Sequence, residues 1–316
     1  MKIFTNPNYD FVRWRWHAIA LSLVVILAGA YLIATRGLQK GVDFEGGSIV
    51  IVKFDQTPNI PAIRNLFGGD AVVLEYGPRA NNEILIRVKR TGSEIGADLS
   101  READKVVTTL QQANLGTFKV IGTEIVGPVV GEQLRKQGLL ATVLAMAGIL
   151  AYIALRFQFS FAVGAVVATL HDLLICLAFL AVFRYDITLN VVAGLLTITG
   201  YSVNDTIVVF DRVRENMRSM RRDNLTTIVN TAVNQTLSRT VITAGTTLLS
   251  VIALYLFGGE VLKGFAFTML VGIISGTYST VFIAASLAIM FQGRKPLKGQ
   301  PAAAPTATRP GRRRAS

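Results

Sequence analysis

Charged side chains are scarce in this sequence, and cysteine is almost absent. Only 16% of the residues are charged whereas 51% are hydrophobic, a balance far from that of a soluble domain and typical of a membrane protein. The single cysteine, Cys176, lies within an apolar run, which excludes a disulfide framework and a cysteine-based metal cluster. The zinc-protease sequence H-E-x-x-H is also missing, and we expect neither a cofactor nor a metal ion.

The basic excess of the chain is concentrated in a few places. A net charge of +12 first suggests a nucleic-acid partner. However, twelve of the twenty acidic residues lie between Arg36 and Lys136, where thirteen basic residues nearly balance them. The excess therefore lies in the N-terminal segment, in a loop from Arg212 to Arg222 and in the C-terminal tail. This distribution is an orientation signal for a membrane protein, and no nucleic-acid partner is expected.

Six segments are long and apolar enough to cross a hydrocarbon core about 30 Å thick, which takes roughly 20 helical residues. The first segment resembles a secretory signal peptide, because Ala28-Gly29-Ala30 looks like a cleavage site. Its apolar run continues to Thr35, so we interpret it as an anchor. The predicted spans cover residues 18–35, 139–155, 161–183, 189–210, 241–257 and 265–291.

An even number of spans puts both termini on one side of the membrane, and the basic segments place that side in the cytoplasm. The tail is rich in proline, alanine and basic residues, which favours a disordered segment attracted to anionic lipid. The predicted organisation is a cytoplasmic N-terminus (1–17), a first transmembrane helix (18–35), a periplasmic domain (36–136), transmembrane helices 2–6 (137–292) with a cytoplasmic loop at about 212–238, and a disordered basic cytoplasmic tail (293–316).

The segment between the first two spans has the pattern of a small α+β domain. Its β-branched runs predict strands at 48–54, 71–77, 83–90 and 117–126. A short helix is predicted at 60–68, and a second helix with Ser100 as its N-cap. The order β-α-β-β-α-β is that of a ferredoxin-like unit.

This predicted outer domain carries no catalytic or metal-binding constellation. Its expected role is contact, either with a partner subunit or with a passing polypeptide chain. Arg87 and Lys89 form a basic row along one strand, and such a row usually belongs to a solvated sheet face.

Ionisable residues are few inside the predicted spans, and each is a candidate functional residue because charge is costly in lipid. Asp205 follows Asn204 in the fourth span, about 9 Å inside its cytoplasmic end, which is too deep for a short side chain to reach water. Arg239 stands where the fifth span begins, and its alternatives are a functional role or a side chain that reaches back to the surface. We interpret Asp205 as a proton-binding group whose proton affinity changes as Arg239 approaches or withdraws.

Helical spacing places further polar and small residues on shared faces. Thr197, Tyr201 and Asp205 are successive i+4 neighbours. In the fifth span a polar stripe contains Arg239, Thr243, Thr246 or Thr247, and Ser250. Small residues recur on one face of the third and sixth spans, which favours close helix packing; they are Gly164, Ala168, Thr268, Gly272, Gly276 and Thr280.

His171 and Asp172 form the remaining polar pair within a span. A histidine in a span can relay protons, or it can make a structural hydrogen bond between helices. Adjacent residues on a helix point about 100° apart, so we do not expect these two side chains simply to form one pair.

Several longer motifs, in this order, closely resemble the SecF branch of the SecD/SecF family of bacterial protein-export subunits. The first is "GVDFEGG" (41–47), which contains Asp43, Gly46 and Gly47 just outside the first span. The others are "GTEIVGPVVGEQL" (122–134), "LLTITGYSVNDTIVVFDRVREN" (195–216), "TLSRTVITAGTTLLSVIALYLFGG" (236–259) and "GTYST" (276–280).

The resemblance implies that the chain is half of a twelve-span bundle related to the resistance-nodulation-division (RND) exporters. SecF-like proteins pair with SecD, a second six-span subunit, and associate with the SecYEG channel and YajC in the bacterial cytoplasmic membrane. The pair uses the proton motive force to promote the later stages of preprotein translocation. The family's intramembrane aspartate and arginine, held to serve proton transport, map onto Asp205 and Arg239. The expected chain is therefore a transport subunit and no enzyme.

Two alternatives remain open. The chain could be half of a proton-coupled exporter of lipids or small molecules, although an outer domain of this size is small for a substrate cavity. It could also be an intramembrane hydrolase that uses Ser202, His171 and Asp205. That reading is weak because no nucleophile-elbow sequence surrounds Ser202.

Overall fold

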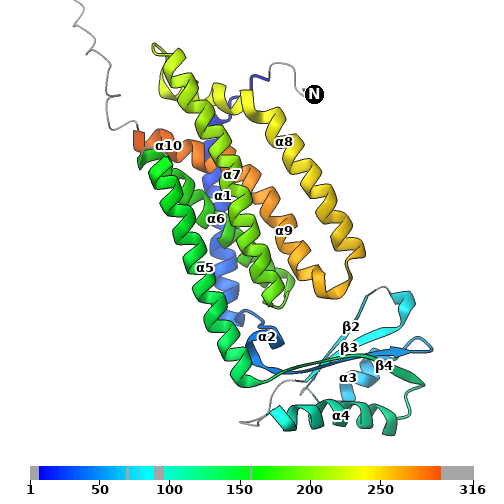
Figure 1. Cartoon of the computed structure of the whole chain (residues 1–316). Coiled ribbons are helices and arrows are strands. Elements are labelled where there is room, and N and C mark those ends of the chain that lie inside the picture. Colours follow the sequence, from blue (N-terminus) through cyan, green and yellow to red (C-terminus); the bar gives the residue numbers. More distant parts are fainter. Residues whose placement is uncertain (1–6, 69–70, 78, 89–95, 157–158, 293–316) are drawn as a thin grey trace, which may run out of the picture.

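The protein consists of a bundle of long helices with a small α+β domain at one end (Figure 1). The computed structural model describes residues 7–68, 71–77, 79–88, 96–156 and 159–292. Lys89, the first residues of the N-terminal segment and the basic tail 293–316 lie outside the described residues, together with the predictions made for them.

The described residues contain six helical stretches that are long and apolar enough to cross a membrane, which confirms the number and order of the predicted spans. The last stretch combines two helices joined by a π-helical turn, Thr280–Ala284. The helices are α1 (Arg15–Arg36), α5 (Pro128–Arg156), α6 (Phe159–Phe183), α7 (Leu189–Ser219), α8 (Leu225–Phe257), and α9 (Gly259–Ser279) with α10 (Ala285–Gln292).

Three of these helices extend well beyond the apolar runs that predicted them. α5 already begins at Pro128, and most of the predicted loop at 212–238 is helical, because α7 continues to Ser219 and α8 begins at Leu225. Asn224 caps α8 by accepting a hydrogen bond from the Thr227 backbone N–H at 2.8 Å. Hydropathy marks the part of a helix suited to hydrocarbon and does not mark the polar turns at its ends, so the predicted bounds were too short.

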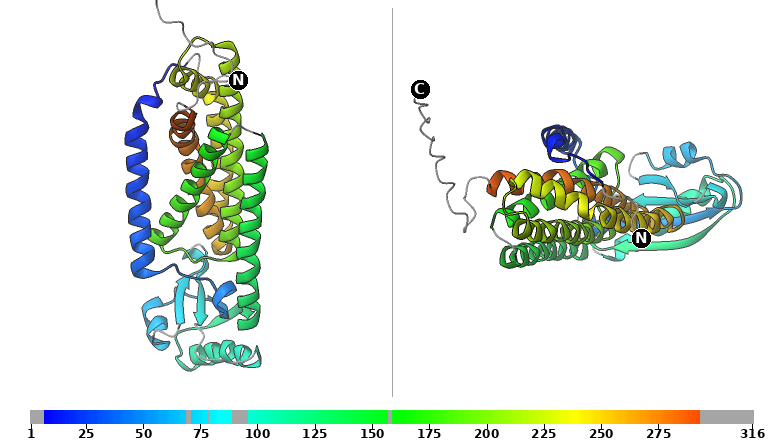
Figure 2. Two further views of the ribbon diagram at one scale, coloured as in Figure 1. Left: turned by 90° about the vertical axis from the view of Figure 1, so that its left-hand side faces the viewer. Right: turned by 90° about the horizontal axis from the view of Figure 1, so that it is seen from above.

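The N-terminal segment is held at the end of the bundle that lies opposite the α+β domain. The start of α1, α10 and the α7–α8 connection lie at the end opposite the α+β domain (Figures 1 and 2). There, the backbone N–H groups of Tyr9 and Phe11 donate to the side chains of Asn234 and Asn230 of α8. The N-terminal segment is thereby fixed to the start of α8, among the basic residues that the sequence placed in the cytoplasm.

The α+β domain has the predicted β-α-β-β-α-β order. Its four strands form one antiparallel sheet with the order β2-β3-β1-β4, so the ferredoxin-like prediction is confirmed. The elements are β1 (Gly47–Phe54), α3 (Ile60–Leu66), β2 (Ala71–Glu75), β3 (Glu83–Val88), α4 (Gly96–Gln112) and β4 (Phe118–Val126), preceded by the short helix α2 (Val42–Glu45). α4 begins before Ser100, so the prediction that Ser100 is its N-cap was wrong.

One face of the sheet is covered by α3 and α4. The side chains of Ile63 from α3 and Leu110 from α4 are fully buried against Val50 and Ile84 of the strands. This apolar core follows from the alternation of the strand sequences, which turns every second residue toward the helices. The other face of the sheet looks toward the bundle across a cleft of about 490 Å³.

The domain is fastened to the bundle at the turn between α6 and α7. The backbones of Gln39 and Gly41 exchange hydrogen bonds with Ile187, each at 2.7 Å. Arg87 of β3 makes an ion pair with Asp186 at 2.5 Å, and its side chain is only 12% exposed. The prediction that Arg87 belongs to a solvated sheet face was wrong, because this face of the sheet meets the α6–α7 turn.

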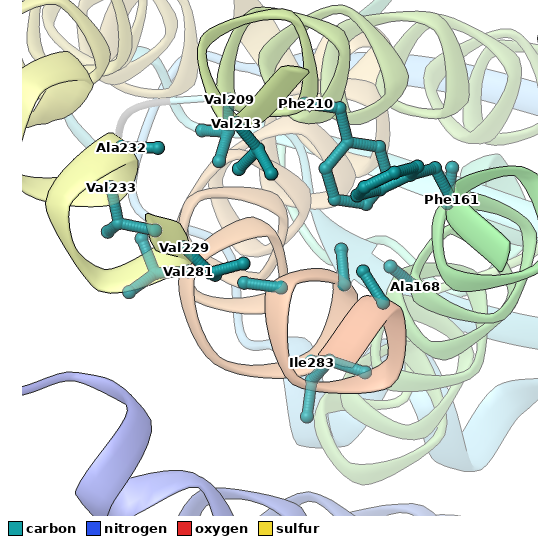
Figure 3. Packing of buried hydrophobic residues seen from close by; sticks show 14 of the residues in the cluster. Phe161, Ala168, Val209, Phe210, Val213, Val229, Ala232, Val233, Val281 and Ile283 are labelled. Atoms are coloured by element: carbon teal, nitrogen blue, oxygen red, sulfur yellow. The ribbon is translucent and has the colours of Figure 1, made fainter. Parts of the chain in front are cut away.

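The bundle itself is held by close packing around the last span, which comprises α9, the π-helical turn and α10. Figure 3 shows the buried cluster in which the rings of Phe161 and Phe210 meet edge to face at a centroid distance of 5.1 Å. A Cβ atom added to Gly272 would overlap the side chain of Ile198, and one added to Gly276 would lie 3.1 Å from Ser202 Cβ. The predicted role of these glycines in close helix packing is confirmed.

Burial is uneven among the spans. In the last span 61% of the apolar stretch is buried inside the chain, whereas the values for α5 and α8 are 6% and 11%. α9 therefore lies in the middle of the bundle, and α5 and α8 present most of their surface outward (Figure 2).

The packing of α9 on α7 predicts a strong effect at Gly272. We expect Gly272→Ala to destabilise the protein by about 1–3 kcal/mol, because the added methyl group would overlap Ile198 in a close-packed interface. Gly245→Ala in α8 is the matched control, since a Cβ there has no neighbour within 4 Å. Thermal unfolding of both variants in detergent measures the difference, and equal melting temperatures would contradict this packing.

The junction predicts that Arg87 contributes more than an ordinary surface charge. We expect Arg87→Ala to cost about 1–3 kcal/mol, because Asp186, with a side chain only 24% exposed, loses its charged partner. Lys53→Ala is the control, since Lys53 pairs with Glu83 but is 51% exposed and should change stability by less than about 1 kcal/mol. Hydrogen exchange in the α6–α7 turn reports the loss, and unchanged protection there in Arg87→Ala would refute the anchoring role.

Candidate functional site: polar groups within the helical bundle

Asp205 lies on the side of α7 that faces α8. Its Oδ1 accepts a hydrogen bond from Thr240 Oγ1 at 3.1 Å. Its Oδ2 is buried and has no hydrogen-bond partner within the described residues. α7 is continuous from Thr188, whose side chain caps its first turn, so Thr197, Tyr201 and Asp205 do lie along one face as predicted. A buried carboxylate oxygen without a donor is a costly arrangement, and it leaves a position where a proton can bind.

Arg239 is exposed on α8, next to Thr240 in the sequence. Within the described part of the chain it makes no ion pair with Asp205, so the carboxylate is held by the neighbouring hydroxyl instead. The two helices bring Asp205 and Arg239 to the same region without direct contact. The sequence could not predict whether the two side chains meet, because spacing along a helix does not fix the rotamer of a long side chain.

The polar stripe of α8 is largely exposed, and each hydroxyl turns back to its own helix. Thr243, Thr246 and Ser250 donate to carbonyl oxygens one turn earlier at 2.9, 2.9 and 3.2 Å. Asn204 of α7 is exposed as well, whereas Tyr201 packs against an apolar cluster around Ile198. The stripe therefore forms an uncovered polar surface on a helix of membrane-spanning length.

His171 and Asp172 lie in the interior of the bundle and contact each other. His171 Nδ1 and Asp172 Oδ1 are 3.0 Å apart, and the side chains are 7% and 1% exposed. The prediction that these neighbours do not form a pair was wrong. The rotation of about 100° between adjacent residues separates their Cβ atoms, but side-chain rotamers bring the ring and the carboxylate together.

Asp172 is also surrounded by serine hydroxyl groups from two other helices. Ser275 of α9 donates to Oδ1 at 2.7 Å, and Ser202 of α7 and Ser279 of α9 donate to Oδ2 at 2.6 and 2.7 Å. A carboxylate buried in this way is stable only because every lone pair has a donor. Asp172 thus has four hydrogen-bond partners, whereas Asp205 has one within the described residues.

The hydrogen bonds continue from His171 to α1. His171 Nε2 lies 2.8 Å from Ser22 Oγ, which donates to Tyr278 Oη at 3.3 Å, and Tyr278 donates to the Ala18 carbonyl at 2.7 Å. Five residues of this site were not predicted from the sequence: Ser22, Thr240, Ser275, Tyr278 and Ser279. Ser275 and Ser279 have i, i+4 spacing, but isolated hydroxyl groups in apolar helices carry no signal that identifies their partner.

The residues of the hydrolase alternative are not brought together. Ser202 donates a hydrogen bond to Asp172, Asp205 accepts one from Thr240, and the His171 ring is hydrogen-bonded to Ser22. Within the described residues no hydrogen bond joins Ser202 to His171, so the nucleophile and base of a catalytic triad are not assembled. Among those residues there is also no group of three or more His, Cys, Asp and Glu side chains that could hold a metal ion.

The motif after the first span forms a tight joint between the domain and α7. Asp43 Oδ2 accepts a hydrogen bond from the Leu189 backbone N–H at 2.8 Å, which caps the start of α7 from outside the helix. Gly46 and Gly47 have φ values of +74° and +135°, and a Cβ on Gly47 would lie 2.8 Å from the Val88 carbonyl oxygen. Glycine is thus required at position 47 by both conformation and space, and at position 46 by conformation.

Two family models match this chain. "Protein export membrane protein SecD/SecF, C-terminal" matches residues 105–294, and "SecD/SecF GG Motif" matches residues 31–58, which include Asp43, Gly46 and Gly47. Both matches agree with the order of motifs in the sequence.

Curated relatives are similar over nearly the whole chain. The protein translocase subunit SecF of Rhodothermus marinus is 41% identical over 93% of this chain and 96% of its own length. The protein translocase subunit SecF of Koribacter versatilis is 35% identical over 92% of this chain and 94% of its own length.

A solved structure also matches the fold. SecDF of Thermus thermophilus, described as a translocon-associated membrane protein, superimposes with a TM-score of 0.80 at 31% identity and covers 92% of this chain. The chain spans about two fifths of that longer protein, 39% of its length. On the family models, the curated relatives and this shared fold, the chain belongs to the SecD/SecF family of protein-export membrane proteins.

Proposed function

We propose that this chain is the SecF-type subunit of a protein-export machine and couples the proton motive force to late stages of preprotein translocation. The observation that carries the proposal is the carboxylate of Asp205, which lies inside a membrane-spanning helix with one oxygen hydrogen-bonded and the other without a partner in the described chain. Such a group binds and releases a proton with little rearrangement of its surroundings.

The proposed driving force acts on this carboxylate. A proton that crosses the full membrane releases about 2.3 kcal/mol per 100 mV of potential. When Asp205 is ionised, the cationic Arg239 stabilises it from α8, and when it is protonated that attraction is lost. Proton binding thus changes the force between α7 and α8. Because α7 begins at the turn fastened to the α+β domain, movement of α7 reaches that domain directly.

The proposed partner is a SecD-type subunit. Arg239 and the hydroxyl groups of α8 form an exposed polar surface, which is costly in contact with lipid and is satisfied by a second protein or by water in a protein cavity. The solved relative named SecDF is much longer than this chain, which is consistent with a second half that covers such a surface.

The remaining assignments follow from charge and family. The basic segments favour an orientation with both termini in the cytoplasm of a bacterium and the α+β domain in the periplasm, so that the cytoplasmic (inner) membrane is the site of action. SecYEG, YajC and a translocating preprotein are the further proposed partners. The proposed domains keep the order predicted from the sequence, with the helix ends at the bounds of the structure and the cytoplasmic loop at about 212–238 folded mostly as helix.

The proposal predicts that Asp205→Asn abolishes the stimulation of export by the proton motive force. The amide keeps the size and the hydrogen bond to Thr240 but neither ionises nor carries the proton. The matched control is Asp211→Asn, six residues further along α7, because Asp211 is exposed and, among the described residues, forms an ion pair with Arg156 alone. Preprotein import into inverted membrane vesicles, with and without a proton gradient, measures the effect.

Two results would contradict this proposal. One is full stimulation of export in Asp205→Asn while the variant remains bound to its SecD-type partner. The other is proton-driven movement of a lipid or small molecule by the reconstituted pair without an effect on export, which would favour the exporter alternative.

Arg239 provides a second prediction. We expect Arg239→Leu to remove most of the stimulation and Arg239→Lys to retain part of it, because lysine keeps the charge but has different geometry. Arg214→Leu, at the exposed end of α7, is the control for the loss of a basic residue. If Arg239→Leu exports as well as the control in the same vesicle assay, the arginine only anchors α8 at the membrane surface.

A further inference from the structure

The group around His171 forms a continuous chain of hydrogen bonds that links four helices. It runs from the Ala18 carbonyl of α1 to Tyr278 of α9, returns to Ser22 of α1, and continues through the ring of His171 to Asp172 of α6. Ser202 of α7 and two serines of α9 complete the surroundings of Asp172. Because these groups are inside the bundle, their hydrogens must be consistent with one another.

The direction of each bond follows from the carbonyl at one end. The Ala18 carbonyl can only accept, so the Tyr278 hydroxyl donates to it. Tyr278 therefore accepts from Ser22, which uses the only hydrogen of that hydroxyl. Ser22 in turn must accept from His171, so Nε2 carries a hydrogen in this arrangement.

The other ring nitrogen points at a carboxylate that already has three donors. One hydrogen lies between His171 Nδ1 and Asp172 Oδ1, whichever atom it is bonded to. With a hydrogen on Nε2 as well, the pair is neutral as a whole, either as imidazolium with carboxylate or as imidazole with carboxylic acid. A neutral pair is the form that a water-free interior favours.

The same heavy atoms also accommodate one proton fewer. If the Ser22 hydroxyl turns from Tyr278 toward Nε2, Ser22 becomes the donor and Nε2 the acceptor across the same 2.8 Å. The bond given up is the one between Ser22 and Tyr278, which at 3.3 Å is the longest in the chain. Asp172 then carries the negative charge, supported by the Nδ1 hydrogen and the three serine hydroxyl groups.

We propose that His171 and Asp172 form a second proton-binding site of the bundle, in which the Ser22 hydroxyl turns as the proton leaves. In the loaded state Nε2 holds the proton. On release, the proton passes to water as hydronium, and Ser22 donates to the vacated nitrogen; loading reverses both steps. Tyr278 is partly exposed, so this end of the hydrogen-bond chain reaches the surface of the bundle.

Few other ionisable groups lie near this pair. α6 contributes Cys176, one turn beyond Asp172, and α9 contributes Tyr278. α1 and α7 contribute the neutral hydroxyl groups of Ser22 and Ser202. Among the described residues, His171 is the only basic side chain within ion-pair distance of Asp172. The charge of the pair is therefore set by its own protons.

This site is separate from Asp205, although both involve α7. Ser202 contacts Asp172 on one side of the helix, and Asp205 contacts Thr240 of α8 one turn further along. α7 thus lies between two proposed proton-binding groups. Asp172 has hydrogen-bond partners on both oxygens, whereas Asp205 has one donor in the described part of the chain. The inference does not depend on the role proposed for Asp205.

Nitrogen NMR of the histidine ring tests the proposal directly. The chain contains two histidines, so ¹⁵N-histidine labelling of His17→Gln leaves His171 as the only signal. The full labelled chain with its unlabelled SecD-type partner in lipid nanodiscs is titrated between about pH 5 and 8, the range in which histidine commonly changes charge. We expect Nε2 to lose its proton as pH rises while Nδ1 stays protonated. Two unchanged nitrogens, or loss of the Nδ1 proton first, would overturn the proposal.

Two matched variants separate the Ser22 switch from general effects on the site. Ser22→Ala removes the group that contacts Nε2 and should displace its transition, whereas Thr35→Ala removes an exposed hydroxyl of the same helix, one that donates to the Tyr31 carbonyl, and should leave the transition in place. Equal displacement by both variants would refute the role of Ser22. The same titration in Asp205→Asn should retain the transition, so failure at His171 and failure at Asp205 are observed independently.

Discussion

The need to satisfy polar groups without water governs this structure. In the interior of a membrane-spanning bundle, a carboxylate must obtain its hydrogen bonds from the protein itself. Asp172 obtains four, from His171 and from three serines on neighbouring helices. Asp205 obtains one, from Thr240, and keeps a buried oxygen without a donor in the described chain. The first arrangement joins three helices around the proton site proposed at His171, and the second leaves a carboxylate ready for a change of charge.

These two sites give α7 its central position. Its buried side is held by Asp172 of α6 and by glycine-mediated contact with α9, whereas its opposite side meets α8 through Asp205. Its first turn is capped by Asp43 from the family motif and is adjoined by the Arg87–Asp186 ion pair. A single helix therefore connects the candidate proton site to the α+β domain, which is the physical basis of the proposed coupling between proton flow and work on a preprotein.

Much of the fold could be predicted because it depends on local pattern. Long apolar runs indicated six spans, and β-branched alternation indicated the strands of the sheet. Helix ends such as Pro128 and Leu225 could not be predicted from hydropathy, because helix continues into polar sequence. The site was predicted only in part: Asp205 was visible as a charge in an apolar segment, but its bond to Thr240, the contact of His171 with Asp172 and the anchoring of Arg87 depend on rotamers and on helix packing.

Proton movement through the reconstituted complex is the direct readout of the proton-coupling role proposed for Asp205. The chain and its SecD-type partner would be placed in sealed vesicles that contain a pH-sensitive dye, and a membrane potential would be imposed. We expect the vesicles to change internal pH with the wild-type chain and Asp205→Asn to reduce the rate to that of vesicles without protein. An equal rate for the wild-type chain and Asp205→Asn would contradict a proton-coupling role for this carboxylate.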